Sequence, residues 1–409
     1  MYSGIGRRTM SDTLAVVNGR LIDGTGAEPV ADATVLMADG RVEAVGPAAD
    51  VSVPEDAHVI DASGRTVMPG IVEGHAHVGG SPAGQQVLRL SLQRGITTVC
   101  SVSANLDGIK LRDGIEAGQV RGCARLIAGC IVTPTFGHVR FRTADGPWEV
   151  RKAVREMASE GADFIKTAAS GGFWAADEVC SVRNYTLEEL LALADEAHAW
   201  HLPVVVHAHT QPGINNSIEA GIDQIHHGAF IDEEGVRGIL EHDLWYMPTL
   251  RVTSDRNIDA WPDRPWMMEE MKESQPIHRA GVRLAHELGV NIALGCDYPG
   301  SAHGWAIGDA SMWELQELTW NGLSPMEAIV AGTKGTAEAY RLDDIGTLEP
   351  GKRGDLLVVD CDPLEDIGGL YDQANINIVV KDGRVESTDE AHKEHYRVRE
   401  DQPASRFQG

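Results

Sequence analysis

Eight short apolar runs, each followed by a stretch with helical character, constrain the fold of this chain more than any other feature. Strands that alternate with helices pair in parallel, and eight such units predict an α/β fold, the (β/α)8 TIM barrel. The segments between the runs carry helix signals, such as Thr186 with Glu189 three residues later, the pattern of a capping box. The eight expected strands are 67–78, 96–103, 125–133, 163–170, 203–209, 224–229, 245–250 and 291–297.

Both ends of the chain carry a different pattern, in which short apolar strands are separated by Asp-Gly turns. Asp39-Gly40 and Asp382-Gly383 are two such turns, and they are typical of hairpins. Since either end alone has too few strands to be stable, we expect both ends to form one small β-sandwich domain. The predicted bounds are 12–65 and 344–390 for this domain, 66–343 for the barrel, and 391–409 for a surface or oligomer-contact tail.

The chain is strongly acidic, with 61 Asp and Glu against 35 Lys and Arg and a net charge of −26. Such a charge repels phosphate backbones and anionic lipid, which argues against binding to nucleic acid or membranes. No run approaches the 18 apolar residues of a membrane span, and no secretory signal is convincing. The six cysteines form no C-x-x-C pair, as is typical of reduced thiols. We therefore expect a cytoplasmic protein, which starts naturally at either Met1 or Met10.

His75 and His77 end the first apolar run and are separated by one residue. Side chains alternate along a strand, so both imidazoles face the same side and suit zinc or a similar transition metal. A plain half-buried strand is the alternative for this pair alone. Because such a metal usually takes three or more protein ligands, we look for the others at the ends of other strands.

Lys166 stands inside an otherwise apolar run, where an uncompensated ammonium would be costly to bury. A depressed pKa would leave a free amine, which CO₂ can convert into a carbamate that bridges two cations. An ion-paired or snorkelling lysine is the alternative. Further polar groups at strand ends, each of which could be structural by itself, are His207, His209, His226, His227 and Asp297. Taken together, they fit a hydrolytic site with two metals.

At this point the chain resembles the amidohydrolase superfamily, in particular its branch of imidazolonepropionase-like, prolidase-like and ochratoxinase-like enzymes. The matching segments are Pro-Gly-Ile-Val-Glu-Gly-His-Ala-His at 69–77, Ile-Lys-Thr-Ala-Ala-Ser-Gly-Gly at 165–172, Val-His-Ala-His at 206–209, His-His-Gly at 226–228 and Gly-Cys-Asp at 295–297. The resemblance extends from about residue 12 to residue 387 and supports the barrel with its small β domain.

The resemblance implies a role for each of these residues. One metal would be held by His75, His77 and Asp297, a second by His207 and His227, and a carboxylated Lys166 would bridge them. Asp297 would also be the general base. His209 and His226 would lie beside the metals without binding them. His226 stands where this branch commonly has Glu, a departure that leaves the local charge and the choice of substrate open.

His138 follows the third strand, where the resembling family has a histidine that contacts the carbonyl or carboxylate of the substrate. We expect the same catalytic or binding role here, with a surface loop histidine as the alternative. Aromatic side chains just beyond the strand ends can line a pocket for an apolar substrate, or they can simply pack loops. The predicted substrate-binding residues are His138, Phe136, Phe173, Trp174, Tyr298 and His303, with Trp261, Trp266 and Trp305 as further aromatic candidates.

These features lead us to expect a metal-dependent amidohydrolase with two divalent ions per chain, zinc being the expected metal. It would cleave the C–N bond of an N-acyl, peptide-like or aryl-amide small molecule through a metal-activated bridging hydroxide. Lactones, carbamates and ureas stay open as substrates. The alternatives are a mononuclear deaminase or cyclic-amidine hydrolase of the same superfamily, and a non-catalytic scaffold with this fold. We also expect a homo-oligomer.

Overall fold

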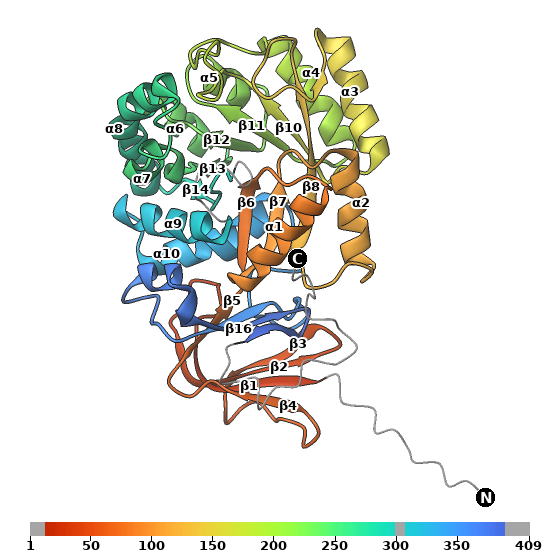
Figure 1. Cartoon of the computed structure of the whole chain (residues 1–409), viewed down its shortest axis with the longest axis vertical. Helices are drawn as coiled ribbons and strands as arrows, with labels where there is room; N and C mark the ends of the chain where they lie inside the picture. Colours follow the sequence, from red (N-terminus) through yellow and green to blue (C-terminus); the bar gives the residue numbers. More distant parts are fainter. Residues whose placement is uncertain (1–12, 299–306, 389–409) are drawn as a thin grey trace, which may run out of the picture.

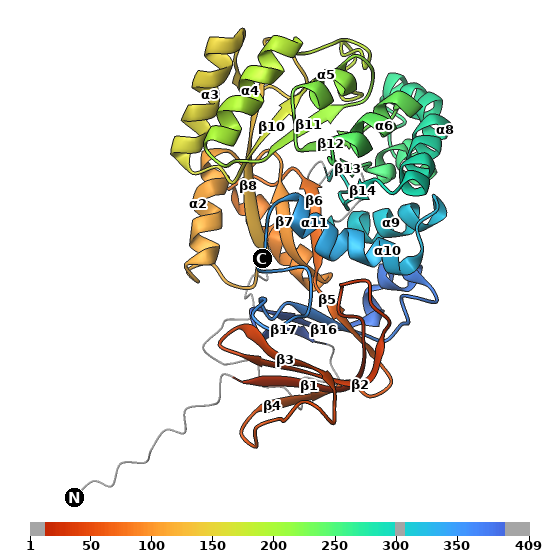
Figure 2. The ribbon, with the colours of Figure 1, turned by 180° about the vertical axis from the view of Figure 1, so that it is seen from behind.

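The computed structural model describes residues 13–298 and 307–388, which form two sheets and a set of surrounding helices (Figure 1). A parallel sheet with helices on its outer side makes up the larger part. A mostly antiparallel sheet lies beneath it and contains strands from both ends of the chain (Figure 2). His303 and Trp305, Met1 and Met10, and the predicted tail lie outside the described residues.

The parallel sheet runs in chain order through β6 (Ile71–Ala76), β7 (Ile96–Ser101), β8 (Arg125–Thr133), β10 (Phe164–Ala168), β11 (Val204–Ala208), β12 (Gln224–His227), β13 (Trp245–Met247) and β14 (Asn291–Ile292), and the short β9 (Arg142–Thr143) pairs with β8. The second sheet contains β1 (Leu14–Leu21), β2 (Val30–Ala38), β3 (Arg41–Pro47), β4 (His58–Asp61), β5 (Thr66–Pro69), β15 (Leu356–Val359), β16 (Ile376–Lys381) and β17 (Arg384–Thr388).

The helices mostly connect successive parallel strands, as the alternating pattern predicts. The α-helices are α1 (Pro82–Gln93), α2 (Asn105–Glu116), α3 (Pro147–Glu160), α4 (Leu187–Ala199), α5 (Gly213–Glu219), α6 (Glu233–Glu241), α7 (Asp255–Ile258), α8 (Pro265–Leu288), α9 (Ile307–Trp320), α10 (Pro325–Val330) and α11 (Thr336–Ala339). The 3-10 helices are η1 (Leu250–Thr253), η3 (Ile367–Tyr371) and η4 (Gln373–Asn375), and η2 (Ala331–Gly335) is a short π-helix. The predicted capping box at Thr186 and Glu189 is present and begins α4. No helix of the described part is long and apolar enough to cross a membrane.

The parallel sheet is curled, and its first and last strands meet without a continuous ladder between them in the described residues. Single backbone hydrogen bonds join the two edges instead, from the Gly74 amide to the Leu294 carbonyl (3.0 Å) and from the His77 amide to the Tyr298 carbonyl (2.9 Å). The predicted strand 291–297 is therefore too long. The chain leaves strand geometry after Ile292, and Asp297 adopts a left-handed backbone conformation with φ = 52°.

The predicted strand 67–78 is also wrong, because it is two strands in two sheets. β5 pairs with β1 and β15 in the lower sheet, and β6 begins the parallel sheet after Gly70. A Cβ on Gly70 would lie 2.3 Å from the side chain of Thr97, so only glycine fits where the chain crosses over. The strands of the lower sheet form one hydrogen-bonded sheet, where the sequence led us to expect the two sheets of a sandwich.

Candidate metal centre and active site

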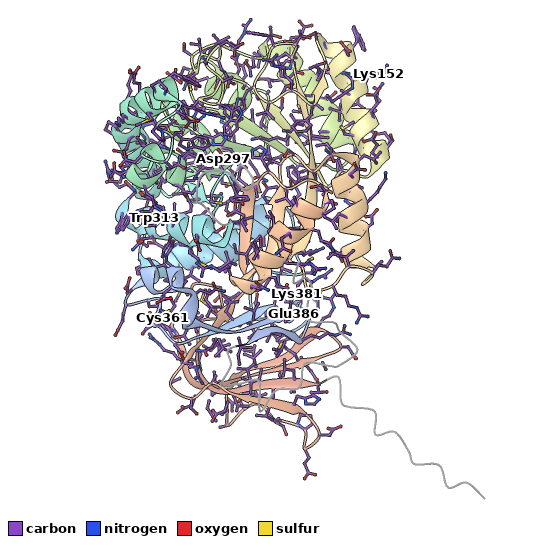
Figure 3. All side chains as sticks on the ribbon, in the orientation of Figure 1. Lys152, Asp297, Trp313, Cys361, Lys381 and Glu386 are labelled. Carbon is purple, nitrogen blue, oxygen red and sulfur yellow. The ribbon has the colours of Figure 1, made fainter. Side chains whose placement is uncertain are left out.

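Two groups of side chains that could hold a metal ion lie at the carboxyl edge of the parallel sheet. The first consists of His75 and His77 from the end of β6 and Asp297 from the segment after β14. The Nε2 atom of each histidine lies 3.3 Å from Oδ1 of Asp297, and Figure 3 places Asp297 in the middle of the upper part. One donor atom from each of the three residues lies within 4.8 Å of the others, close enough for a shared ion.

The second group contains His207 and His209 at the end of β11 and His227 at the end of β12. Their donor nitrogens also lie within 4.8 Å of one another. The sequence led us to place His209 outside the ligand set, but the structure brings its ring into a stack with His227, with 4.9 Å between the centroids. Nδ1 of His209 is buried and has no hydrogen-bond partner in the described part of the chain. His209 is thus a third possible donor to this group.

Lys166 on β10 lies at the same edge, with its residue 4% exposed. Its Nζ has no hydrogen-bond partner among the described residues, and no ion pair is seen for it there. The predicted alternative of an ion-paired lysine is therefore absent from this part of the molecule. Burial lowers the pKa of Lys166 to about 7, and the nearby charge of Asp297 opposes this shift only in part. At neutral pH a large share of Lys166 is the free amine.

The buried imidazoles are in the form that binds metal. Burial lowers the pKa of His75, His207, His209 and His227 well below the ordinary value, so their rings are neutral. Burial by itself would raise the pKa of Asp297, but the hydrogen bond to His77 and the neighbouring positive charges outweigh it and lower the pKa. Asp297 is therefore a carboxylate.

Hydrogen bonds on the far side of each ring fix which nitrogen is free for a metal. Nε2 of His207 donates to the Gly171 carbonyl (3.0 Å), which leaves Nδ1 free. Nδ1 of His227 lies 2.9 Å from the Thr249 hydroxyl, which leaves its Nε2 free. Nδ1 of His77 lies 3.0 Å from the Ser103 hydroxyl, which leaves its Nε2 facing Asp297. Such partners orient metal ligands and set their tautomer.

His226 lies behind His75 at the edge of this site. Their Nδ1 atoms are 2.7 Å apart and share a hydrogen bond, and Nε2 of His226 lies 3.1 Å from the side-chain oxygen of Gln224. Both ring nitrogens of His226 are therefore engaged by side chains of the protein, His75 on one side and Gln224 on the other. This arrangement suits a residue that orients His75 without binding a metal.

Two residues that the sequence analysis missed support the ligands. Glu73 is fully buried and accepts hydrogen bonds from the His75 amide (2.7 Å), the Cys296 amide (2.9 Å) and the Ser311 hydroxyl (2.6 Å). Arg251 donates to the carbonyls of Cys296 (2.6 Å) and Asp297 (2.9 Å) and so ties η1 to this segment. Glu73 could have been found, because it is a charged residue in an apolar run, the same signal that marked Lys166.

A cavity of about 450 Å³ opens above the two donor groups. This is the usual size of a small-molecule site. Its polar lining residues include His77, His138 and Asp297. Its apolar lining residues, which we call the apolar wall, are Phe141, Phe173, Trp174, Val252, Trp261, Met267 and Met271.

The predicted substrate-binding residues have mixed outcomes. His138, Phe173 and Trp174 line the cavity. Phe136, in the loop after β8, does not line it, and this residue is 66% exposed. Tyr298 is buried and does not line the cavity, and its backbone pairs with that of His75 and His77.

Comparison with known proteins places these features in a family context. A model of the amidohydrolase family matches residues 66–385. The ochratoxinase of Aspergillus niger is 26% identical over 425 residues, which cover 90% of this chain and 85% of that protein. An imidazolonepropionase of Nocardia farcinica is 26% identical, with 81% and 86% covered. The crystal structure of a Xaa-Pro dipeptidase with methionine in its active site superposes with a TM-score of 0.82 at 28% identity, covering 91% of this chain and 99% of that one.

Proposed function

The chain belongs to the amidohydrolase family, and from this premise we propose that it is a binuclear metal-dependent hydrolase of small-molecule amides. The observation that carries the proposal is the position of Lys166. Its buried Nζ has no hydrogen-bond partner in the described residues, and it lies at the same sheet edge as two groups of metal-binding side chains. A carbamate on Lys166 would supply a carboxylate to both donor groups. It would also explain why an amine without a hydrogen-bond partner is buried at this position, which otherwise costs free energy.

The donor set fits two divalent ions. We propose that His75, His77 and Asp297 hold one ion, that His207 and His227 hold the other with His209 beside them, and that carboxylated Lys166 is shared. Imidazole and carboxylate donors of this kind suit zinc, which we propose as the native metal. When bound, such ions lower the pKa of a water molecule and polarise the scissile carbonyl.

The protein's own side chains would carry the proton transfers. Asp297 is a carboxylate with access to the cavity, so it can accept the proton of the attacking water and pass it to the departing nitrogen. His138 faces the same cavity and can contact the carbonyl or a remote carboxylate of the substrate. The apolar wall would bind an aromatic or apolar group next to the scissile bond, which favours N-acyl, peptide-like or aryl amides.

Metal analysis of the purified protein is the direct experiment. We expect about two divalent ions per chain, because two separate donor groups are present, together with turnover in a panel of N-acyl amino acids, dipeptides and anilides. About one ion per chain would favour a mononuclear deaminase or cyclic-amidine hydrolase. No bound ion and no turnover would favour a non-catalytic scaffold and contradict the proposal.

Replacing His138 by alanine is expected to lower activity without changing the metal content, since no ring atom of His138 belongs to either donor group. If His138 polarises the scissile carbonyl, kcat and kcat/KM should fall together. If it binds a remote carboxylate, KM should rise and kcat should be nearly unchanged. Steady-state kinetics on the best substrate distinguish these cases. Wild-type values of kcat and KM in the variant would show that His138 has no role in the reaction or in substrate binding.

The oligomeric state and the location in the cell are two further predictions from the sequence. A homo-oligomeric state is proposed on the expected role of residues 391–409, which lie outside the described residues, and size-exclusion chromatography with light scattering would test it. A cytoplasmic location is proposed on the cysteine pattern, and cell fractionation would test that.

A further inference from the structure

Glu178 lies in the loop between β10 and α4, outside any sequence motif. Its carboxylate receives three hydrogen bonds. Oε1 accepts one from Nδ1 of His138 and one from the Gly172 amide (3.0 Å), and Oε2 accepts one from the Ala175 amide (3.3 Å). The side chain is only 15% exposed. Glu178 thus connects the loop that carries His138 to the loop that follows Lys166.

The ring of His138 is confined on two sides. It stacks on the ring of His207, with centroids 3.8 Å apart and an interplanar angle of 19°. A Cβ on Gly172 would lie 2.7 Å from Cε1 and Nδ1 of His138, so the ring packs directly against the glycine backbone. These contacts fix the plane of the ring. They do not decide which of its edges faces the cavity.

The hydrogen bond to Glu178 determines which edge of the His138 ring faces the cavity. A carboxylate only accepts hydrogen bonds, so Nδ1 of His138 must carry the hydrogen in this pair. The ring lies beside the donor groups and lines the larger cavity. Its Nε2 has no hydrogen-bond partner in the described part of the chain, which leaves this nitrogen free for the substrate. A ring rotated by a half turn would lose the bond to Glu178.

We propose that Glu178 is a positioning residue, which holds His138 with Nδ1 protonated and Nε2 directed to the substrate. This inference rests on the proposed function, because it concerns the same site. It differs from a purely structural role, in which Glu178 would only tie its loop through the amides of Gly172 and Ala175. The two roles predict different results in a double-mutant cycle.

The test combines Glu178→Gln with His138→Ala. Glutamine keeps the size and one acceptor oxygen for the backbone amides, but its amide group can donate to His138 and permit the other tautomer. We expect Glu178→Gln to lower kcat/KM by about tenfold or more, the size usual for partners that orient site residues. In the His138→Ala background the same change should alter kcat/KM by less than about twofold. Equal losses in both backgrounds would overturn the proposal.

A readout other than activity keeps the inference separate from the proposed function. In protein labelled with ¹⁵N at histidine and measured with its metal as purified, His138 signals can be assigned by their loss in His138→Ala. We expect the Nδ1-protonated pattern in the wild type and a changed pattern in Glu178→Gln. An unchanged pattern would overturn the proposal even if amide hydrolysis is confirmed, and a changed one would support it even if no amide is cleaved. Asp177→Asn, at an exposed carboxylate in the same loop, is the matched control and should alter neither measurement.

Discussion

Replacing Lys166 by alanine is expected to reduce turnover by more than about 100-fold and to remove most of one metal ion per chain. The loss of a residue that only orients a ligand costs about 10- to 100-fold in metal affinity or activity, so the loss of a shared ligand should cost more. Kinetics and metal analysis on the same preparation measure both effects. Partial recovery with short carboxylic acids would support the bridging carboxylate, because such acids can occupy the space left by the carbamate.

Lys152→Ala is the matched control, because this lysine lies on the outer helix α3 with its side chain 71% exposed (Figure 3). It should match the wild type in both measurements. A Lys166→Ala protein that keeps two ions and full turnover would contradict the bridging role.

The pKa of Lys166 predicts that metal loading of the protein depends on pH. The value of about 7 lies below that of an ordinary lysine, so the amine is free above this pH and protonated below it. Only the free amine reacts with CO₂. Loading of metal-free protein should therefore be faster at pH 8 with bicarbonate than at pH 6, and this difference should be absent in Lys166→Ala.

Replacing Asp297 by asparagine is expected to lower kcat by about 10²- to 10⁴-fold, the range typical of lost general acid–base help. Asparagine has nearly the same size, keeps one oxygen ligand, and tolerates the left-handed backbone conformation at this position. Metal content should consequently fall far less than turnover. Steady-state kinetics and metal analysis measure the two effects.

An exposed aspartate provides the control for this substitution. Asp107→Asn at the start of α2, where the side chain is 75% exposed, should leave kcat unchanged. Turnover near the wild-type value in Asp297→Asn would rule out Asp297 as the proton acceptor.

The sequence predicted the strand-end groups well, because strand periodicity determines where these side chains are placed. His75, His77, Lys166, His207 and His227 all lie at the carboxyl edge of the parallel sheet. This placement needs only the length of each apolar run and the direction of parallel strands.

The surroundings of these groups could not be predicted in the same way. His209 joins the second donor group because its ring stacks on His227, a contact between neighbouring strands. Glu178 meets His138 across 40 residues of sequence. Phe136 lies in the loop after β8 with φ = 64° and is 66% exposed. Loop geometry and contacts between distant segments carry no periodic signal in one sequence.

The apolar wall and the donor groups are built on separate parts of the chain. The donors lie mostly on strand ends of a rigid sheet, whereas much of the wall comes from residues 252–271, between η1 and the first turns of α8. Arg264 reinforces that segment by lying over the rings of Trp174 and Trp261 at 4.5 and 4.9 Å. Substitutions at the wall residues of this segment are therefore expected to change which amide is bound more than they change the metal content.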